Sequence, residues 1–186
     1  YQQLIMIYTI VQAILIFGMP QSLLYYFPRK ETHEHPLLIK QTWTILIFSS
    51  LMVMAIFWLS SQIIGTHHLK EYLVLLGIYT SLMIFVMPTQ NLLTLEGKIS
   101  TAMWLMVFFT IIDLAVLPSA AWLNPTTLGI VHGIIVAALL KAIMVLFHVY
   151  TTYFTKEISG NSYIKEQLAY GIPVGLTAMV YVINVN

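Results

Sequence analysis

The stretch Phe17–Arg29, FGMPQSLLYYFPR, joins three signals that are typical of the end of a membrane helix. A Gly-Met-Pro interruption is followed by two tyrosines, whose rings favour the headgroup level of a bilayer, and then by the basic pair Arg29-Lys30. The residues upstream are almost wholly apolar, which predicts one helix over residues 3–27, roughly 37 Å long at 1.5 Å per residue. We therefore expect a membrane span whose C-terminal end faces the cytoplasm.

The composition excludes a soluble globule. Of the 186 residues, 59% are hydrophobic and only 8% are charged, and the mean hydropathy is +0.86, whereas about 25% of the residues of a soluble domain are charged. The absence of cysteine excludes disulfides and Cys-based metal sites. The chain is predicted to be an all-α, polytopic integral membrane helix bundle.

Further apolar runs follow, separated by short polar turns. They predict membrane helices over residues 37–64, 73–95, 99–123 and 128–154, then a polar linker over 155–166 and a partial span over 167–186. Residues 1–154 are expected to form most of an N-terminal membrane lobe, and the last residues the start of a second lobe. Because the chain opens on Tyr1 and stops inside an apolar run, we expect it to be an internal part of a longer protein.

The basic residues are distributed unevenly between the loops. The loops after the first, third and fifth spans, with their flanks, hold Arg29, Lys30, Lys40, Lys98, Lys156 and Lys165, whereas those after the second and fourth hold only Lys70. Short cytoplasmic loops are enriched in Lys and Arg. This pattern predicts that the chain enters the membrane from outside and that the linker over 155–166 is cytoplasmic.

Three motifs resemble the polysaccharide flippase family of the MOP superfamily, which also contains the multidrug and toxic compound extruders. FGMPQSLLYYFPR at Phe17–Arg29 resembles the end of the second helix of Wzx-type oligosaccharide flippases, and LEGK at Leu95–Lys98 resembles their fourth-to-fifth helix turn. EQLAYGIPVGLTAMV at Glu166–Val180 resembles the start of their seventh helix, where the second six-helix lobe begins. The resemblance covers the whole chain, as helices two to six and the start of the seventh.

The resemblance implies a twelve-helix transporter of two lobes in the cytoplasmic membrane. Such a protein moves a polyprenyl-diphosphate-linked oligosaccharide from the inner to the outer leaflet by alternating access, for polysaccharide or O-antigen biosynthesis. It implies coupling to a proton or sodium gradient without a bound cofactor. The implied partners are the lipid-linked oligosaccharide, membrane lipid, and the polysaccharide polymerase and chain-length machinery.

Asp113 and Lys141 are charged residues near the middle of two neighbouring predicted spans, so they are able to meet. A charge at the centre of a membrane helix costs about 2.5 to 3.5 kcal/mol on insertion scales, and such residues are functional candidates by default. One hypothesis makes Asp113 a protonatable coupling site and Lys141 a contact for the substrate diphosphate. The alternatives are a purely structural ion pair or a neutral, protonated Asp113.

A second set of candidates follows from the chemistry of the implied substrate. A diphosphate needs cations, and sugars need amide and hydroxyl hydrogen bonds. The basic candidates at the predicted cytoplasmic mouth are Arg29, Lys30 and Lys40, and the amide candidates are Gln12, Gln21, Gln90 and Asn91. The alternatives are that the basic residues set topology alone and that the amides make hydrogen bonds between helices.

Prolines and paired glycines lie within the predicted spans. Pro20, Pro88, Pro118 and Pro173 are each expected to kink or bend a helix, which suits alternating access. The motifs Gly129-x-x-x-Gly133 and Gly171-x-x-x-Gly175 permit close helix approach, and we interpret them as packing motifs.

Other kinds of site find little support in the sequence. His33-Glu34-His35 lacks the i, i+4 spacing of a helical zinc site, so no metal is predicted. His132 and His148 are able to join a proton path, although packed histidines are the simpler interpretation. No nucleophile-base set, phosphate loop or nucleic-acid patch is apparent, so neither an enzyme nor a nucleic-acid-binding protein is predicted.

Two alternatives to a flippase remain open. The first is a cation-coupled multidrug antiporter of the same superfamily, whose cavity would be acidic or aromatic rather than basic; Asp113 and Lys141 point in both directions. The second is a non-transporting membrane subunit of a polysaccharide assembly complex, in which Lys141 would be fully paired.

Overall fold

A computed structural model of the chain describes residues 18–63, 67–155 and 162–185, in which every regular element is a helix. The elements are α2 (Met19–Tyr26), the 3₁₀ turn η1 (Phe27–Arg29), α3 (His35–Ile63), α4 (His67–Leu95), α5 (Ile99–Leu123), α6 (Thr127–Val149), the π-helical turn η2 (Tyr150–Phe154) and α7 (Ile164–Val185). The predicted all-α class is confirmed for these residues.

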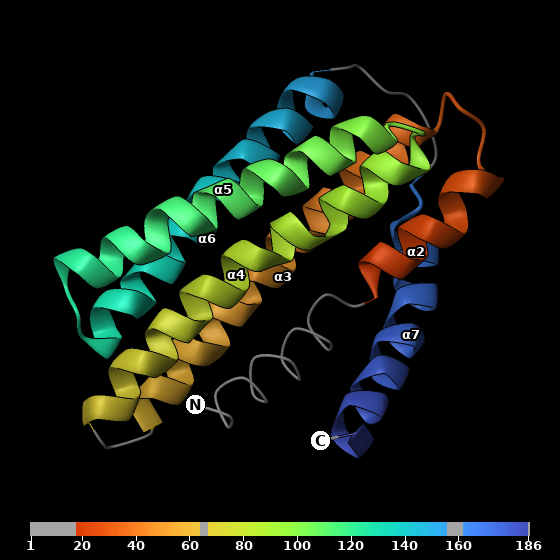
Figure 1. The fold of residues 1–186 in the computed structure, drawn as a ribbon. Helices are drawn as coiled ribbons and strands as arrows, with labels where there is room; N and C mark the ends of the chain where they lie inside the picture. Colours follow the sequence, from red (N-terminus) through yellow and green to blue (C-terminus); the bar gives the residue numbers. More distant parts are fainter. Residues whose placement is uncertain (1–17, 64–66, 156–161, 186) are drawn as a thin grey trace.

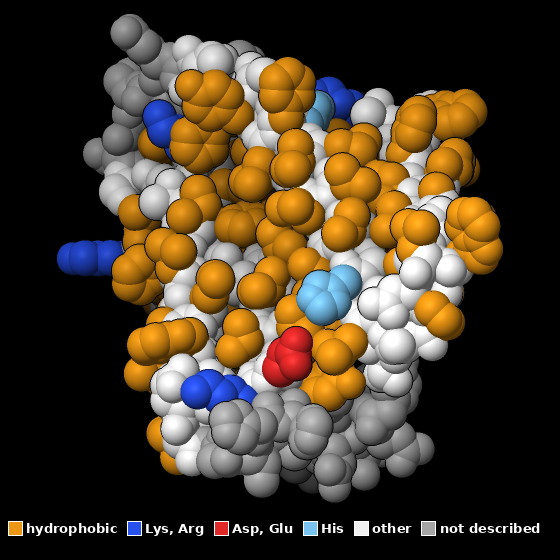
Figure 2. Space-filling view, turned by 90° about the vertical axis from the view of Figure 1, so that its left-hand side faces the viewer, with side chains coloured by type: hydrophobic (Ala, Val, Ile, Leu, Met, Phe, Trp, Pro, Cys, Tyr) orange, Lys and Arg blue, Asp and Glu red, His pale blue; other side chains and the backbone are white. Residues whose placement is uncertain are grey.

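Four of these helices are long and apolar enough to cross a membrane. They cover His35–Ile63, Lys70–Leu95, Ile99–Leu123 and Thr127–Phe154. The side of the molecule drawn in Figure 2 carries mainly hydrophobic side chains and few charged ones. Large apolar patches of this kind are rare on soluble monomers, so the helices and the surface together indicate a membrane-embedded protein.

The long helices form two antiparallel hairpins, α3 with α4 and α5 with α6, that lie side by side (Figure 1). In the first hairpin the hydroxyls of Ser50 and Ser81 each donate to the other residue's carbonyl, at 3.2 and 3.1 Å. In the second, a Cβ added to Gly133 would lie 2.5 Å from the Cβ of Ala120. Small residues therefore allow close helix approach in both hairpins, and Gly133 has the packing role predicted for it.

The first predicted span is wrong as a single helix over residues 3–27. Gly18 has φ +57°, outside the helical region, and α2 begins after it. A Cβ on Gly18 would lie 2.4 Å from the carbonyl oxygen of Gly171 in α7, so this backbone contact requires glycine. Pro20 consequently stands in the first turn of α2, where it interrupts no helical hydrogen bond. Residues 1–17 lie outside the described residues.

Other boundaries differ more modestly from the predictions. Helix α4 begins at His67 rather than at residue 73, because its first turns contain the charged residues Lys70 and Glu71 that a hydropathy boundary leaves out. Helix α7 begins at Ile164, inside the predicted linker over 155–166. The span predicted over 99–123 coincides with α5. Pro88, Pro118 and Pro173 lie inside α4, α5 and α7.

Helix α7 is attached to the start of α3. The buried amide of Gln167 donates to Thr42 Oγ1 at 3.0 Å and to the carbonyl of Leu38 at 3.3 Å. The backbone N–H of Tyr163 donates to Gln41 Oε1 at 2.8 Å. Near this attachment a hydrophobic core extends between α2, α3, α4 and the end of α6; its members include Met19, Leu23, Trp43, Ile84, Leu92 and Val149.

The starts of α3, α5 and α7 and the ends of α4 and α6 share one end of the bundle, here called the basic end. Of the described lysines and arginines it holds Arg29, Lys30, Lys40, Lys98 and Lys165, whereas Lys70 lies at the opposite end and Lys141 near the middle of α6. Lys156 lies outside the described residues. The predicted sorting of basic residues by loop therefore corresponds to a sorting by end of the fold.

Candidate functional site

The α5–α6 hairpin brings Asp113 and Lys141 together. The two helices turn at Asn124-Pro125, and the two residues stand roughly 15 and 21 Å from that turn at 1.5 Å per residue. The turn is stabilised by Thr126, whose hydroxyl caps α6 by accepting from the N–H of Gly129 at 3.1 Å. Because both residues lie near the middle of their helices, the pair stands at membrane depth.

Their contact is a bidentate ion pair. Lys141 Nζ lies 2.6 Å from each carboxylate oxygen of Asp113. The two side chains differ in exposure, at 11% for Lys141 and 42% for Asp113. The ammonium also lies 5.8 Å from the centre of the Phe109 ring, within the range of cation–π attraction. The lysine is therefore enclosed, while the aspartate is open on one side.

Asp113 borders two hollows. One, of about 230 Å³ between α4, α5 and α6, is also lined by Lys141 and by Tyr79 and Met83 of α4. The other, of about 250 Å³ between α4 and α5, is lined by Gln90 and Phe109. The amide candidate Gln90 thus shares the second hollow with Asp113 but not with Lys141. The three polar side chains come from three different helices.

The basic candidates lie far from this pair. Asp113 is about 21 Å along α5 from Ile99 at the basic end. There, Arg29 donates to the carbonyl of Tyr25 at 2.8 Å and its guanidinium lies 3.6 Å from that ring's centre. Lys30 lies 3.7 Å from the carboxylate of Glu166 and 3.9 Å from the Tyr163 ring centre. The candidate residues therefore form two separate groups.

The remaining amide candidates do not join either group through a described contact. Gln21 is exposed on α2, and Asn91 is half-buried on α4. Gln12 lies outside the described residues.

The three side chains of His33-Glu34-His35 contact different partners in the fold. His33 lies 3.3 Å from the carboxylate of Glu31, and the His35 ring stacks on Phe27 with centroids 3.8 Å apart. Glu34 accepts a hydrogen bond from the Tyr163 hydroxyl. Within residues 18–63, 67–155 and 162–185, no three His, Asp or Glu side chains gather as a metal site.

The Glu34–Tyr163 hydrogen bond joins the loop before α3 to the residue preceding α7. It lowers the pKa of Glu34 from its usual value of 4.5, because the donated hydroxyl stabilises the carboxylate. The same bond raises the pKa of Tyr163 to about 12. The contact is consequently strongest when Glu34 is charged and Tyr163 is neutral.

The two histidines of α6 have different surroundings. His132 is exposed, and its Nδ1 lies 2.7 Å from the carbonyl of Leu128. His148 lines a hollow of about 190 Å³ together with Thr89 and Thr101. Its Nε2 is buried and has no hydrogen-bond partner among the described residues.

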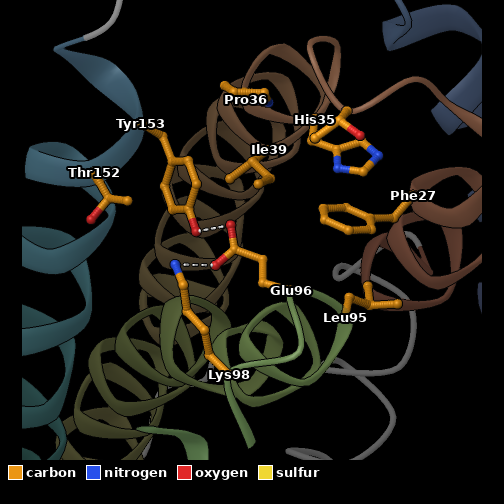
Figure 3. A pocket seen from close by; sticks show the side chains of 10 residues that line it. Phe27, His35, Pro36, Ile39, Leu95, Glu96, Lys98, Thr152 and Tyr153 are labelled. Atoms are coloured by element: carbon orange, nitrogen blue, oxygen red, sulfur yellow. Dashed lines mark hydrogen bonds and ion pairs between the residues drawn. The ribbon is translucent and has the colours of Figure 1, made fainter.

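Sequence reasoning missed a polar cluster at the basic end (Figure 3). Tyr153 donates its hydroxyl to Glu96 Oε1 at 2.5 Å, and Lys98 Nζ donates to Glu96 Oε2 at 2.8 Å. In the sequence, Glu96 and Lys98 belong to the turn motif LEGK, and Lys98 counts among the basic residues of the predicted cytoplasmic loops. Their two-residue spacing is a weak local signal, and nothing in the sequence indicates Tyr153, which comes from the other hairpin.

Comparison of the chain with protein-family models, with curated proteins and with solved structures finds no match. The function is therefore argued from the geometry of the chain and from the resemblance of its motifs.

Proposed function

We propose that the chain is part of a secondary transporter that flips a polyprenyl-diphosphate-linked oligosaccharide across the cytoplasmic membrane. The observation that carries this proposal is the Asp113–Lys141 ion pair, which lies at membrane depth beside two hollows. Charged side chains in membrane spans usually face a bundle interior or a water-filled cavity and mark substrate or ion pathways. The Asp113 carboxylate is 42% exposed in the described part of the chain, so it is open to a proton or a competing ligand.

The proposed chemistry is an exchange of partners at Lys141. A diphosphate competes with the Asp113 carboxylate for the lysine ammonium, which acts as a point charge for phosphate oxygens. Protonation of Asp113 weakens its hold on Lys141, which frees the ammonium for the diphosphate. Re-formation of the Asp113–Lys141 ion pair then displaces the diphosphate and releases the substrate on the other side. No covalent step is required.

The wider proposal follows from the motif resemblance. The described helices would be most of the N-terminal lobe of a MOP-type transporter, with the basic end in the cytoplasm. Arg29, Lys30 and Lys40 would then stand where an inner-leaflet substrate arrives. A polysaccharide polymerase and chain-length machinery would act on the transported product.

A cation-coupled multidrug antiporter of the same superfamily is the second candidate. One observation favours it: Asp113 is the more exposed partner of the pair, so an organic cation would meet a carboxylate before it meets the lysine. A non-transporting subunit of a polysaccharide assembly complex would need neither hollow.

The test is export of surface polysaccharide by the full-length protein in a host that lacks its own copy. Wild type, Lys141→Ala and the matched control Lys70→Ala are compared, with the amount of each protein in the membrane measured. We expect Lys70→Ala to restore export, and Lys141→Ala to fail while lipid-linked oligosaccharide accumulates on the cytoplasmic side. Normal export by Lys141→Ala would show that Lys141 is not needed for substrate transport. Failure of the wild type would favour the antiporter or the non-transporting subunit.

A further inference from the structure

A pocket of about 410 Å³ opens at the basic end, away from the Asp113–Lys141 pair (Figure 3). Five segments contribute to it: η1, the loop before α3, the start of α3, the α4–α5 turn and the π-helical turn η2. One wall is apolar, and the other is polar. The apolar residues are Phe27, Pro36, Ile39 and Leu95, and the polar ones are Thr32, His35, Glu96, Lys98, Thr152 and Tyr153.

The carboxylate in the polar part of the lining is already paired. Both carboxylate oxygens of Glu96 accept hydrogen bonds, one from Tyr153 and one from Lys98. The negative charge is thereby compensated within the protein. The Lys98 ammonium has further N–H groups, and its side chain is 47% exposed. The lining therefore offers a ligand these N–H groups beside the hydroxyls of Thr32 and Thr152, which both donate and accept.

His35 uses its donor within the protein. Its Nε2 lies 3.1 Å from the carbonyl oxygen of Lys30, and because a carbonyl only accepts, Nε2 carries a proton. The ring stacks on Phe27, so His35 contributes a flat ring face to the lining rather than a free N–H group.

An uncompensated cation stands beside the pocket. Lys40 follows the lining residue Ile39, and its Nζ lies 5.5 Å from the ring of Phe154, the residue after Tyr153. Among the described residues Lys40 has no ion-pair partner within 4.0 Å, unlike Lys30 and Lys98. Lys40 therefore adds a positive charge near Phe154, next to the lining residue Tyr153 though not itself part of the lining, and a positive charge there favours an anion.

The backbone of one wall is also unusual. Tyr150–Phe154 forms a π-helical turn at the end of α6, and it supplies both Thr152 and Tyr153 to the pocket. Single π turns are rare and are often found at functional sites. The turn ends the candidate membrane span Thr127–Phe154 at the basic end.

We propose that this pocket binds the phosphate group of a phosphorylated membrane lipid. Lys98 donates to the phosphate oxygens, Lys40 adds positive charge near Phe154, and the apolar residues Phe27, Ile39 and Leu95 contact the start of the lipid chains. Because Lys40 also stands where the proposed lipid-diphosphate substrate arrives, this inference rests in part on the proposed function. The two can fail separately, since the binding measured below does not involve Lys141 and the export test does not involve Lys98.

The test measures ligand adducts on the full-length protein in detergent by native mass spectrometry. The probes are short-chain phosphatidic acid, the matching diacylglycerol, which lacks only the phosphate, and inorganic phosphate. Lys98→Gln and Lys40→Gln are compared with Lys70→Gln, which removes a lysine from the opposite end. Lys40→Gln leaves the Glu96 hydrogen bonds intact, so it remains informative if Lys98→Gln impairs folding.

We expect phosphatidic acid to bind at least tenfold better than diacylglycerol. The affinity should fall on the order of tenfold in Lys98→Gln, because hydrogen bonds to charged groups are the stronger ones, and less in Lys40→Gln. Lys70→Gln should bind as the wild type does. If inorganic phosphate binds with the same dependence on Lys98 and Lys40, the phosphate contacts are supported, but the ligand is a soluble phosphate and not a lipid. Equal binding of phosphatidic acid and diacylglycerol, or equal affinity in all three variants, would overturn the proposal.

Discussion

Lys141 of α6 holds both carboxylate oxygens of Asp113 of α5 at 2.6 Å, yet the lysine is nearly enclosed while the aspartate remains 42% exposed. A proton or a competing ligand therefore reaches the pair from the side of Asp113. Helices α5 and α6 form the hairpin that brings the pair together, and the capped turn at Thr126 and the close contact of Gly133 with Ala120 fix their register. This asymmetry is the structural basis of the proposed exchange.

Removing one partner should cost more than removing both. Asp113→Asn leaves the Lys141 ammonium unpaired at membrane depth, and we expect a loss of about 1–3 kcal/mol, below the range for a fully buried pair because Asp113 is half-exposed. The double variant Asp113→Leu/Lys141→Met should recover most of that loss. Thermal unfolding in detergent of Asp113→Leu, Lys141→Met and the double variant, beside the wild type, completes a double-mutant cycle, and strictly additive losses would contradict a coupled pair.

Gly133 should tolerate no larger side chain. A Cβ there meets the Cβ of Ala120 at 2.5 Å, so Gly133→Leu must separate α5 from α6 and should cost about 1–3 kcal/mol. Gly97 provides the matched control, since it has φ +73° and nothing within 4 Å of an added Cβ. Gly97→Asn, a residue that adopts this conformation, should cost far less. Similar melting temperatures for the two variants would speak against close packing in the hairpin.

The reciprocal hydrogen bonds of Ser50 and Ser81 should stabilise the α3–α4 hairpin modestly. Hydrogen bonds between membrane helices average about 0.6 kcal/mol, so Ser50→Ala and Ser81→Ala should each lower stability by roughly that amount. Each variant leaves one of the two bonds in place, and the double variant removes both. Denaturant unfolding in mixed micelles measures the losses; a loss above about 2 kcal/mol for either single variant would mean that packing rather than hydrogen bonding was disturbed.

Attachment of α7 through Glu34 and Tyr163 should weaken in acid. The folded-state pKa of Glu34 lies below its usual 4.5, so its contribution is fully present above pH 4.5 and is lost as the pH falls through the lowered pKa. Tyr163, with its pKa raised to about 12, loses its contribution as the pH rises from 10 towards 12.

The measurement is the difference in melting temperature between wild type and Tyr163→Phe across the pH range. This difference should be constant near neutral pH and shrink as Glu34 becomes protonated. Glu34→Gln provides the control, because it should abolish the acid dependence. An equal difference at about pH 7 and about pH 3.5 would contradict the assigned contact.

Much of the helical framework was predictable because the turns are marked locally. Helix α5 coincides with its predicted range, since Gly97 precedes it and Asn124-Pro125 ends it. The meeting of Asp113 and Lys141 was also predictable, because two residues near mid-span in an antiparallel hairpin stand at similar depth. In both cases the prediction depends on a short turn between two helices that follow one another in the sequence.

The features that were not predicted depend on distant contacts. The break at Gly18 accompanies its contact with Gly171, which belongs to a helix at the far end of the chain. The hydrogen bond between Glu96 and Tyr153 requires the C-terminal ends of α4 and α6 to lie beside each other. The π-helical turn that contains Tyr153 has no recognisable pattern in the hydropathy of the sequence. Such contacts cannot be read from periodicity or composition.

The most direct test of the proposed function is the translocation of lipid-linked oligosaccharide by the full-length double variant Asp113→Leu/Lys141→Met, reconstituted in vesicles beside the wild type. The double variant removes both charges without leaving either unpaired, so it separates stability from function. We predict normal insertion and near-wild-type melting, with translocation abolished. Translocation at the wild-type rate would contradict a role of the ion pair in transport.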